Sequence, residues 1–350
     1  MPRKTRARDV SGKEKSSLAE VGEDGVIRYL RRRHRPSGSR VTLGIGDDAA
    51  IFSPPRGKKV VFTSDIMAEG VHFSLDTSSP ADVGFKLAAV NVSDIAAMGG
   101  RPTGALLSLA LPGDTAFDFV RRLSAGLRAA EKKFGFQLLG GDTTASASRI
   151  FTSLALFGEL RARRPLTRSG AAPGDGIYVT GHLGASVLGL AALNAGGGSP
   201  GGGPFQAVVR KHLRPVPPLA WGARLAERSL ASAAMDLSDG LSTDLGRLCR
   251  ESGVGAEIET ASLPIRPTTR KAAAALGHEA AAAALHGGEE YELLFTVRPG
   301  KVKSVERIAA RQKTRISRIG TILRERKVFE VSSAAGRKPL QPGGWRHFRD

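Results

Sequence analysis

The sequence predicts two α/β or α+β domains, and three observations support this class. The chain has 350 residues, enough for two domains that each bury a core. Strand and helix patterns are mixed in both halves, without the strict alternation that a fully parallel sheet requires. The character of the chain changes at Arg161-Ala-Arg-Arg-Pro165. We therefore expect an N-terminal domain at 18–160 and a C-terminal domain at 161–350, after a disordered basic tail at 1–17.

The elements of the first half follow from apolar spacing. Apolar residues three or four positions apart, such as Val83, Leu87 and Val90, predict helices. Short apolar runs that end in turn residues, such as Pro112-Gly113, predict strands. The expected helices are 18–33, 80–98 and 115–134. The expected strands are 41–43, 59–63, 103–111, 136–139 and 150–157.

Apolar spacing and turn residues also predict the elements of the second half. A turn at Gly174-Asp-Gly176 precedes a strand, and Gly181-His-Leu-Gly184 precedes a helix. The Gly-rich run 196–204 predicts a surface loop. Further helices are expected within 215–229, at 242–252, in the Ala-rich run 271–285 and at 301–312. A Gly turn at 287 feeds a strand that ends at 297, and two short strands follow 312.

The composition limits the function classes. The net charge is 52 − 33 = +19, but no aromatic residues interleave with the basic runs, so we expect a solvated basic surface and no specific nucleic-acid partner. The single cysteine, Cys249, excludes a disulfide within the chain and fits a helical core position. No apolar run approaches a membrane-spanning length and no secretory signal is visible, so we expect a cytoplasmic protein.

Aspartates among small or apolar residues are the chemical signal in this sequence. Asp94 is the only acid in Asn91-Val-Ser-Asp-Ile-Ala-Ala-Met-Gly-Gly100. A buried carboxylate needs a partner, and a metal ion is one adequate partner. Four other stretches repeat this theme: Gly44-Ile-Gly-Asp-Asp-Ala-Ala50, Thr63-Ser-Asp65, Gly140-Gly-Asp-Thr-Thr144 and Met235-Asp-Leu-Ser-Asp-Gly-Leu241. Together they predict a hard-cation site assembled from several loops, which we expect where the domains meet.

The chemistry of this site follows from its donor atoms. Carboxylates and hydroxyls suit Mg²⁺, and no His or Cys cluster suits zinc. Several such acids near Gly-rich turns are typical of a site for a phosphate-rich ligand. The P-loop, dinucleotide-binding and protein-kinase motifs are all missing. The residues alone therefore predict magnesium-dependent phosphate chemistry by another architecture.

Seven motifs, taken in order, resemble those of the thiamine-monophosphate kinase family. They are G-I-G-D-D-A-A, T-S-D-x-x-x-E-G-V-H-F, N-V-S-D-I-A-A-M-G-G, L-L-G-G-D-T-T, L-T-R-S-G, D-L-S-D-G-L and G-G-E-E-Y-E-L, and they cover roughly residues 18–348. Several are shared with the wider superfamily of aminoimidazole-ribotide synthetase, which includes selenophosphate synthetase. The resemblance implies a two-domain aminoimidazole-ribotide synthetase-like fold, with an N-terminal mixed sheet or half-barrel domain and a C-terminal α/β domain.

The resemblance also implies an activity and partners. It implies ATP-dependent phosphorylation of thiamine monophosphate to the diphosphate, with several Mg²⁺ ions and ATP as co-substrate. It implies direct transfer of the γ-phosphate without a phosphoenzyme, which needs positioning and charge neutralisation more than a base. It further implies a homodimer that pairs strands of its N-terminal domains, so that 18–160 binds metal and ATP and dimerises while 161–350 completes the site.

Carried over by motif, the site residues fall into four groups. The metal ligands are Asp48, Thr63, Ser64, Asp65, Asp94, Asp142, Asp236 and Asp239, with Asp47 as a neighbour that holds the loop or accepts a further hydrogen bond. The residues that match ATP contacts are Gly141, Asp142, Arg168 and Ser238. The residues that match thiamine-phosphate contacts are His72, Glu289 and Trp345. Asp94, Asp65 and Asp239 are the residues expected to be catalytic.

Other interpretations stay open at this point. Asp236 or Asp239 could cap the helix that follows, His72 could be structural, and Glu290 and Glu292 could lie on the face of a strand. The turn acids Asp114 and Asp175, and the solvated helix end Arg31 to Arg35, are assigned no function. A sister synthetase is the nearest alternative, although selenophosphate synthetase needs a reactive Cys or selenocysteine near its N-terminus. A basic nucleic-acid-binding protein, with salt-sensitive binding, is the alternative from a different class.

Overall fold

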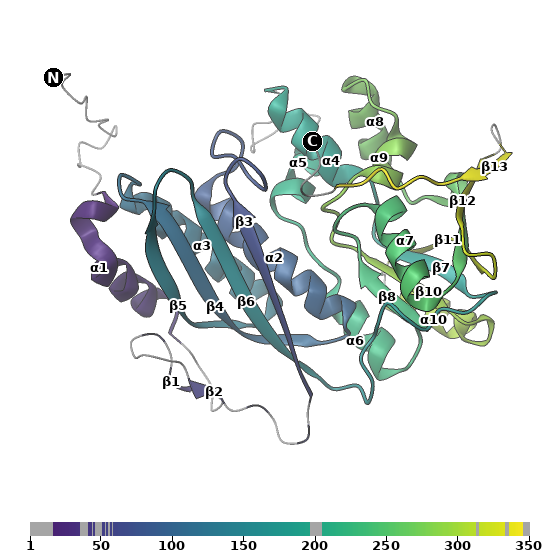
Figure 1. Ribbon diagram of the computed structural model, residues 1–350, viewed down its shortest axis with the longest axis horizontal. Helices are drawn as coiled ribbons and strands as arrows, with labels where there is room; N and C mark the ends of the chain where they lie inside the picture. The colour runs from purple at the N-terminus through teal and green to yellow at the C-terminus, as the bar shows by residue number, and fades with distance from the viewer. Residues whose placement is uncertain are drawn as a thin grey trace. The chain divides into compact units, whose positions relative to one another are not determined.

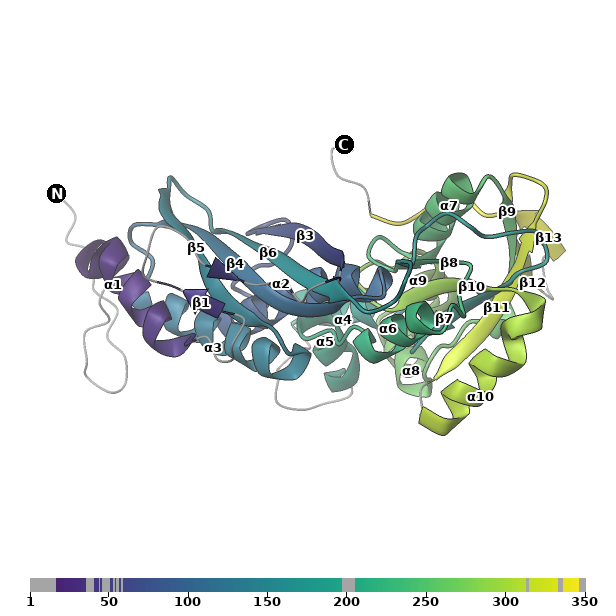
Figure 2. The same cartoon turned by 90° about the horizontal axis from the view of Figure 1, so that it is seen from below.

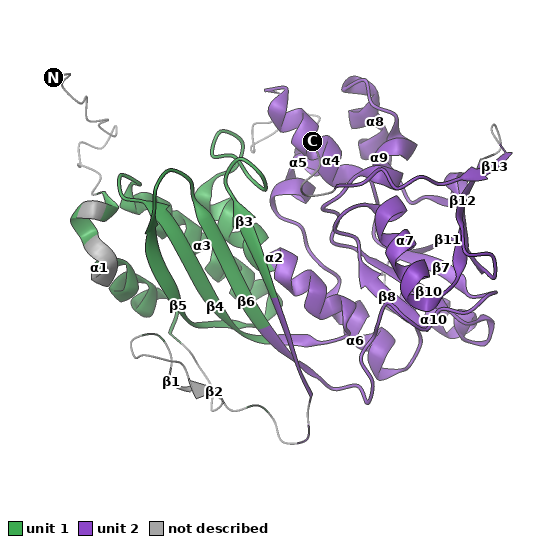
Figure 3. Cartoon of the chain, viewed as in Figure 1, with its two compact units in different colours: residues 1–55, 64–88, 103–156 green, residues 56–63, 89–102, 157–350 purple. Residues whose placement is uncertain are grey.

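The computed structural model describes residues 17–35, 41–43, 45, 51–52, 54, 57, 59–196, 205–312, 315–332 and 336–345 (Figure 1). Its α-carbon contacts divide the chain into two compact units that interleave in sequence (Figure 3). Unit 1 comprises 1–55, 64–88 and 103–156, and unit 2 comprises 56–63, 89–102 and 157–350. Residues 1–16 of the expected basic tail lie outside the described residues. Residues 197–204 of the expected Gly-rich loop also lie outside them.

Unit 1 begins with α1 (Leu18–Arg33), whose start is fixed by a capping box. The Ser17 hydroxyl accepts the Glu20 amide, and the Glu20 carboxylate accepts the Ser17 amide. The helix has the bounds that the sequence predicts, and Arg31 to Arg33 are exposed as expected. His34 is the exception within this basic run, because it is buried between Glu131 and Ser124, 2.7 and 2.8 Å away.

A four-stranded sheet organises the N-terminal half, in the order β3-β6-β4-β5. Its strands are β3 (Lys59–Ala68), β4 (Arg101–Pro112), β5 (Gln137–Ser146) and β6 (Phe151–Leu160), with β4 and β5 parallel. A separate short pair joins β1 (Val41–Leu43) to β2 (Ile51–Phe52). The helices are α2 (Pro80–Ala97) and α3 (Phe117–Phe134).

Helices α2 and α3 approach closely because glycine lies on each side of the contact. A Cβ atom on Gly84 would meet the Leu123 carbonyl oxygen at 2.2 Å, and one on Gly126 would meet the Ala81 carbonyl oxygen at 1.9 Å. Only glycine fits at either position. The apolar face of α3, with Leu123 and Leu127, is fully buried in unit 1.

Unit 2 contains a seven-stranded sheet in the order β13-β12-β9-β11-β7-β10-β8. Neighbouring strands in this sheet run antiparallel, except that β12 and β9 run parallel to each other. The strands are β7 (Gly176–Thr180), β8 (Ala233–Asp236), β9 (Gly255–Glu259), β10 (Leu293–Val297), β11 (Ile316–Leu323), β12 (Val328–Ser332) and β13 (Gly336–Pro339). The helices are α4 (Ala185–Asn194), α5 (Gln206–Leu213), α6 (Leu219–Glu227), α7 (Leu241–Ser252), α8 (Pro267–Ala275), α9 (Ala280–His286) and α10 (Val302–Gln312).

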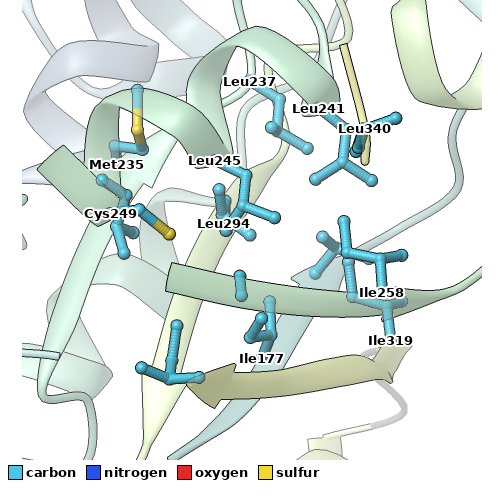
Figure 4. Close-up of a cluster of buried hydrophobic side chains, with 14 of the residues drawn as sticks. Ile177, Met235, Leu237, Leu241, Leu245, Cys249, Ile258, Leu294, Ile319 and Leu340 are labelled. Carbon is cyan, nitrogen blue, oxygen red and sulfur yellow. The ribbon is translucent and has the colours of Figure 1, made fainter. Parts of the chain in front are cut away.

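Both faces of this sheet are covered, because successive strand residues point to opposite sides. Ile177 and Leu294 join a core with α7 residues such as Leu245 and Cys249 (Figure 4). Tyr178 and its neighbours on β10 join a second core with residues of α6 and α10. Figure 2 shows the strands lying between α7 and α10. Cys249 is therefore a packing residue, as predicted, and burial raises the pKa of its thiol to about 12.

Several sequence-based boundaries are wrong. Strands β3 and β5 continue through Asp65 and Asp142, so these acids lie within strands and not in loops. The Ala-rich run forms two helices, because Gly277 at φ +70° ends the first. The sequence predicted no element at β2, α5, β8 or β9, and it predicted only two of the three strands β11, β12 and β13. Asp114 lies in a turn as predicted, and so does Asp175, although its carboxylate is buried and accepts the Ala172 amide.

Candidate functional site

Asp94 lies near the end of α2, where the helix is stopped by glycine. Gly99 takes φ +75°, and the Gly100 amide donates to the Ile95 carbonyl, which completes the last turn. The Thr63 hydroxyl, from β3, donates a hydrogen bond to the Asp94 carboxylate. Burial raises the pKa of Asp94, and the Thr63 hydrogen bond and the nearby Arg168 guanidinium partly offset this rise. The carboxylate therefore lies in a place where a cation would favour its charged form.

Asp236 lies beside the same stretch of α2. It ends β8, it is buried, and it accepts a hydrogen bond of 2.8 Å from the Ser93 hydroxyl. Ser93 precedes Asp94 in the chain, so within unit 2 two successive residues of α2 bond to Thr63 and Asp236, which lie far apart in the sequence. Ser93 was not named from the sequence; the only signal was its position next to Asp94.

Arg168 lies on a segment that is held to this region by backbone hydrogen bonds. The Leu166 amide donates to the Met98 carbonyl at 3.1 Å, and the Ala234 amide donates to the Thr167 carbonyl at 2.8 Å. The Arg168 carbonyl accepts a hydrogen bond from Ser252, while its side chain is exposed. The Arg168 guanidinium is thus an exposed, planar cation with several N–H donors, carried by a backbone that is fixed by hydrogen bonds. Such a group suits a phosphate ligand.

Asp239 does not cap α7, and neither does Asp236. The N-cap position is Gly240, and the Asp244 carboxylate accepts the amides of Asp239 and Gly240 at 3.0 and 3.1 Å. Arg247 pairs with both Asp239 and Asp244, at 2.5 and 2.9 Å. Burial, followed by the charge of Asp239, raises the pKa of Asp244 to about 6. The capping interpretation is therefore wrong, and the sequence reading missed Asp244 and Arg247.

The turn at Ser238 and Asp239 accepts backbone hydrogen bonds from two residues that are predicted to contact the substrate. The Ser238 carbonyl accepts the Glu289 amide at 2.6 Å, and the Asp239 carbonyl accepts the Trp345 amide at 3.0 Å. Glu289 takes φ +61°, which is uncommon for a residue with a side chain, and its carboxylate lies 3.3 Å from the His212 ring. The Trp345 side chain is 52% exposed.

The remaining described residues of the prediction belong to unit 1. Asp65 and Ser64 lie on β3, where the Ser153 hydroxyl donates to the Asp65 carbonyl at 2.8 Å. Asp142 is exposed on β5. Strands β3 and β5 are separated by β6 and β4, so the sheet does not place Asp65 and Asp142 on neighbouring strands.

Two further unit 1 residues have defined local geometry. A Cβ atom on Gly141 would meet the Leu107 carbonyl oxygen at 1.8 Å, so β5 requires glycine there. The Ala68 amide donates to His72 Nδ1 at 3.1 Å, which leaves the hydrogen of the neutral imidazole on Nε2. His72 is therefore fixed in the tautomer that presents a donor at Nε2.

Within the described ranges, no group of three or more His, Cys, Asp or Glu side chains is gathered as a metal cage. Asp47 and Asp48 lie outside the described residues. Mg²⁺ commonly uses one or two carboxylates together with substrate phosphates and water, so it does not require a complete protein cage.

Glu290 and Glu292 do not lie on a strand face, so the sequence-based interpretation is wrong. Both precede β10, and both are buried. Glu290 accepts the Ser186 amide at 3.0 Å in the first turn of α4, and Glu292 pairs with Lys211 at 2.7 Å. Burial is the largest cause that raises the pKa of Glu290, to about 7. These two acids hold the segment that carries Glu289.

The architecture defines a class of protein. The model of the N-terminal domain of AIR synthase related proteins matches residues 46–160, and the model of their C-terminal domain matches 172–332. A solved structure of thiamine-monophosphate kinase from Stenotrophomonas maltophilia is 34% identical, covers 87% of this chain and 95% of its own, and superposes with a TM-score of 0.78. The chain is thus a two-domain AIR synthase related protein, as the predicted fold class required.

Individual relatives identify one family within this class of AIR synthase related proteins. The thiamine-monophosphate kinase of Salmonella typhimurium is 40% identical over 280 residues, which is 79% of this chain and 82% of the relative. A structure described as AaThiL complexed with AMPPCP and TMP is 31% identical, with a TM-score of 0.75, and covers 96% of this chain and all of its own. The chain belongs to the thiamine-monophosphate kinase family.

Proposed function

We propose that this protein transfers the γ-phosphate of ATP to thiamine monophosphate, in a reaction that depends on Mg²⁺ and forms thiamine diphosphate. The observation that carries the proposal is the cluster in unit 2, where Thr63 contacts Asp94, Ser93 contacts Asp236, and Arg168 lies near Asp94. Such a cluster supplies oxygen ligands and one phosphate-binding cation. The relative solved with AMPPCP and TMP supports the choice of substrates.

The donor atoms of the cluster fit Mg²⁺. They are carboxylate and hydroxyl oxygens, which are the ligands that this ion prefers. A bound cation would stabilise the charged form of the half-buried Asp94 carboxylate, whose pKa is raised by burial. We propose Thr63, Asp94 and Asp236 as ligands here, and Ser64, Asp65, Asp142, Asp239 and Asp48 as the further ligands of several ions. Bound Mg²⁺ would neutralise charge on the phosphate oxygens.

The proposed reaction needs no nucleophile from the protein. An ionised phosphate oxygen of thiamine monophosphate attacks the γ-phosphorus of ATP in line. The new P–O bond forms as the bond to the β,γ-bridging oxygen breaks, and ADP leaves with that oxygen. Because the attacking oxygen is already charged, the chain must mainly bind, align and neutralise.

Each binding role is assigned to a group with suitable chemistry. Arg168 binds ATP phosphate through its guanidinium fork. Gly141 and Ser238 are proposed as further contacts to the nucleotide. His72 donates from Nε2 to the substrate phosphate. Trp345 stacks on a ring of thiamine, where its π face attracts the cationic thiazolium.

We also propose that the protein is a homodimer paired through the four-stranded sheet. The face of this sheet presents large apolar side chains, and Ile66, Leu106 and Phe151 are 57%, 41% and 40% exposed. An apolar face of this kind suits a second copy of the chain. Light scattering should give twice the monomer mass, and Ile66→Asp should reduce it. The control, Val216→Asp, alters an exposed valine of unit 2 and should leave the dimer intact.

No helix in the described part of the chain is long and apolar enough to cross a membrane. We propose a cytoplasmic enzyme because its co-substrate is ATP, and cell fractionation would test this.

The deciding experiment is an assay of purified protein with ATP, Mg²⁺ and thiamine monophosphate, with products separated by chromatography. Thiamine diphosphate and ADP should form in equal amounts, and EDTA should abolish both. ADP without thiamine diphosphate would redirect the assignment to a sister synthetase. A chiral γ-thiophosphate of ATP should be transferred with inversion, and retention would exclude direct transfer.

A further inference from the structure

Residues 340–345, here named the C-terminal strap, lie along the turn between β8 and α7. Leu340 is buried in the same core as Leu237 and Leu241 (Figure 4). Three consecutive backbone amides follow. Gly343 donates to Ser242 Oγ at 3.2 Å, Gly344 donates to Thr243 Oγ1 at 3.1 Å, and Trp345 donates to the Asp239 carbonyl at 3.0 Å. The C-terminal strap is therefore held at one end by the burial of Leu340 and at the other by hydrogen bonds from its last three amides.

The two glycines of the strap are required by the contact itself. A Cβ atom on Gly344 would lie 1.9 Å from the Asp239 carbonyl oxygen, and one on Gly343 would lie 2.6 Å from His286 Nδ1. Another residue at Gly344 would displace the backbone, and one at Gly343 would displace the strap or the His286 ring. The first residue with a side chain after them is Trp345. The position of Trp345 therefore depends on the contacts that Gly343 and Gly344 make with the turn.

The hydroxyls that receive the strap are themselves fixed. Ser242 and Thr243 are 2% and 7% exposed. Ser242 Oγ lies 2.9 Å from His286 Nδ1. Because the Gly343 amide is the donor in one of these bonds, the Ser242 hydroxyl hydrogen is available for His286 Nδ1. Both hydroxyls therefore act as acceptors of defined position in the first turn of α7.

The same turn serves Glu289. The carbonyls of Ser238 and Asp239 are consecutive, and they accept the amides of Glu289 and Trp345 respectively. A shift of the turn would thus move both proposed substrate contacts, together with the Asp239 side chain.

We propose that Ser242 and Thr243 are positioning residues for substrate binding: by accepting the strap amides they hold Trp345 at the acidic turn. This inference rests on the proposed function, because it takes Trp345 to contact thiamine monophosphate. Neither hydroxyl touches the substrate. Loss of one frees the strap, lowers the fraction of molecules with Trp345 in place and weakens substrate binding by that fraction.

The test compares Thr243→Val, which removes the acceptor and keeps the shape, with Thr243→Ser, which restores a hydroxyl. The matched control is Thr260→Val, because the Thr260 hydroxyl is buried and has no hydrogen-bond partner among the described residues. Hydrogen exchange of the 343–345 amides reports on the strap. Acrylamide quenching reports on Trp345, since the only other tryptophan, Trp221, is buried.

We expect Thr243→Val to speed exchange of these amides about tenfold or more. It should increase quenching and raise the KM for thiamine monophosphate about five- to tenfold, with kcat changed less than twofold. Thr243→Ser and Thr260→Val should behave as the parent protein. Unchanged exchange, or freed amides with an unchanged KM, would overturn the proposal. A parent protein that shows strap protection but no turnover of thiamine monophosphate would instead refute the proposed function.

Discussion

The Ser93 hydroxyl donates a 2.8 Å hydrogen bond to the Asp236 carboxylate, although 143 positions separate the two residues. This bond joins the end of α2 to the end of β8 within unit 2. It holds Asp236 to the part of α2 that also carries Asp94, since Asp94 follows Ser93 directly. The proposed magnesium ligands are therefore organised by a side chain that is not itself a proposed ligand.

Removal of the Ser93 hydroxyl should weaken both the fold and the metal site. Ser93→Ala takes a buried donor from a buried carboxylate, and such losses cost about 1–3 kcal/mol. The melting temperature should fall by a few degrees, and the Mg²⁺ concentration for half-maximal activity should rise. Ser262→Ala, which removes an exposed hydroxyl bonded to Glu259, should change neither. Equal behaviour of the two variants would exclude the role given to Ser93.

Asp94 should be essential for transfer but not for folding. Asp94→Asn keeps the shape and removes the charge, so we expect kcat to fall about 10³-fold, comparable with loss of a major electrostatic contact. Circular dichroism and the melting temperature should stay near those of the parent, because burial disfavours the charged carboxylate. Asp114→Asn, in an exposed turn, is the control. Normal turnover of Asp94→Asn would remove Asp94 from the metal site.

Glu290 should make stability fall as the pH rises. Its carboxylate is buried beside Lys211 of α5, with Glu292 in the same segment, and burial raises its pKa from the ordinary 4.5 to about 7. Between these values the folded state holds a proton that the unfolded state has lost, so raising the pH through this window favours unfolding. Above about pH 7 both states are ionised and the Glu290 penalty stays constant.

Glu290→Gln should remove this contribution. We expect the difference in unfolding free energy between Glu290→Gln and the parent, measured by denaturant titration, to move in favour of the variant from pH 4.5 to 7. The difference should then level off. Glu259→Gln, on an exposed side chain, should give a constant difference. A constant difference for Glu290→Gln as well would show that the carboxyl titrates normally.

Trp345 should contribute binding rather than chemistry. If the indole stacks on the substrate equally in the ground and transition states, Trp345→Ala raises the KM for thiamine monophosphate and leaves kcat nearly unchanged. A cation–π contact of about 1–2 kcal/mol corresponds to roughly a tenfold change. Trp345→Phe should lose less, and the KM for ATP should not move. An unchanged KM for thiamine monophosphate in Trp345→Ala would exclude this residue from substrate binding.

Local patterns in the sequence predicted the element types and the fold class, and they singled out acids that accept side-chain hydrogen bonds from distant parts of the chain. Asp94 and Asp236 stood out because a carboxylate among apolar residues needs a partner. The boundaries failed where hydrogen bonds to neighbouring strands extend a strand beyond its apolar run, as at Asp65 and Asp142. No local signal could reveal that Ser93 meets Asp236 or that Lys211 meets Glu292, because these pairs depend on the tertiary fold.

The bond between Glu290 and the Ser186 amide has a consequence for the order of folding. Helix α4 receives this partner for its first turn from a residue 104 positions later in the chain. During synthesis α4 leaves the ribosome well before Glu290 does, so its first turn stays frayed until the segment before β10 arrives. Closing so long a loop is slow compared with forming the helix. A chain truncated before residue 287 should therefore expose the start of α4 to proteases even though every residue of that helix is present.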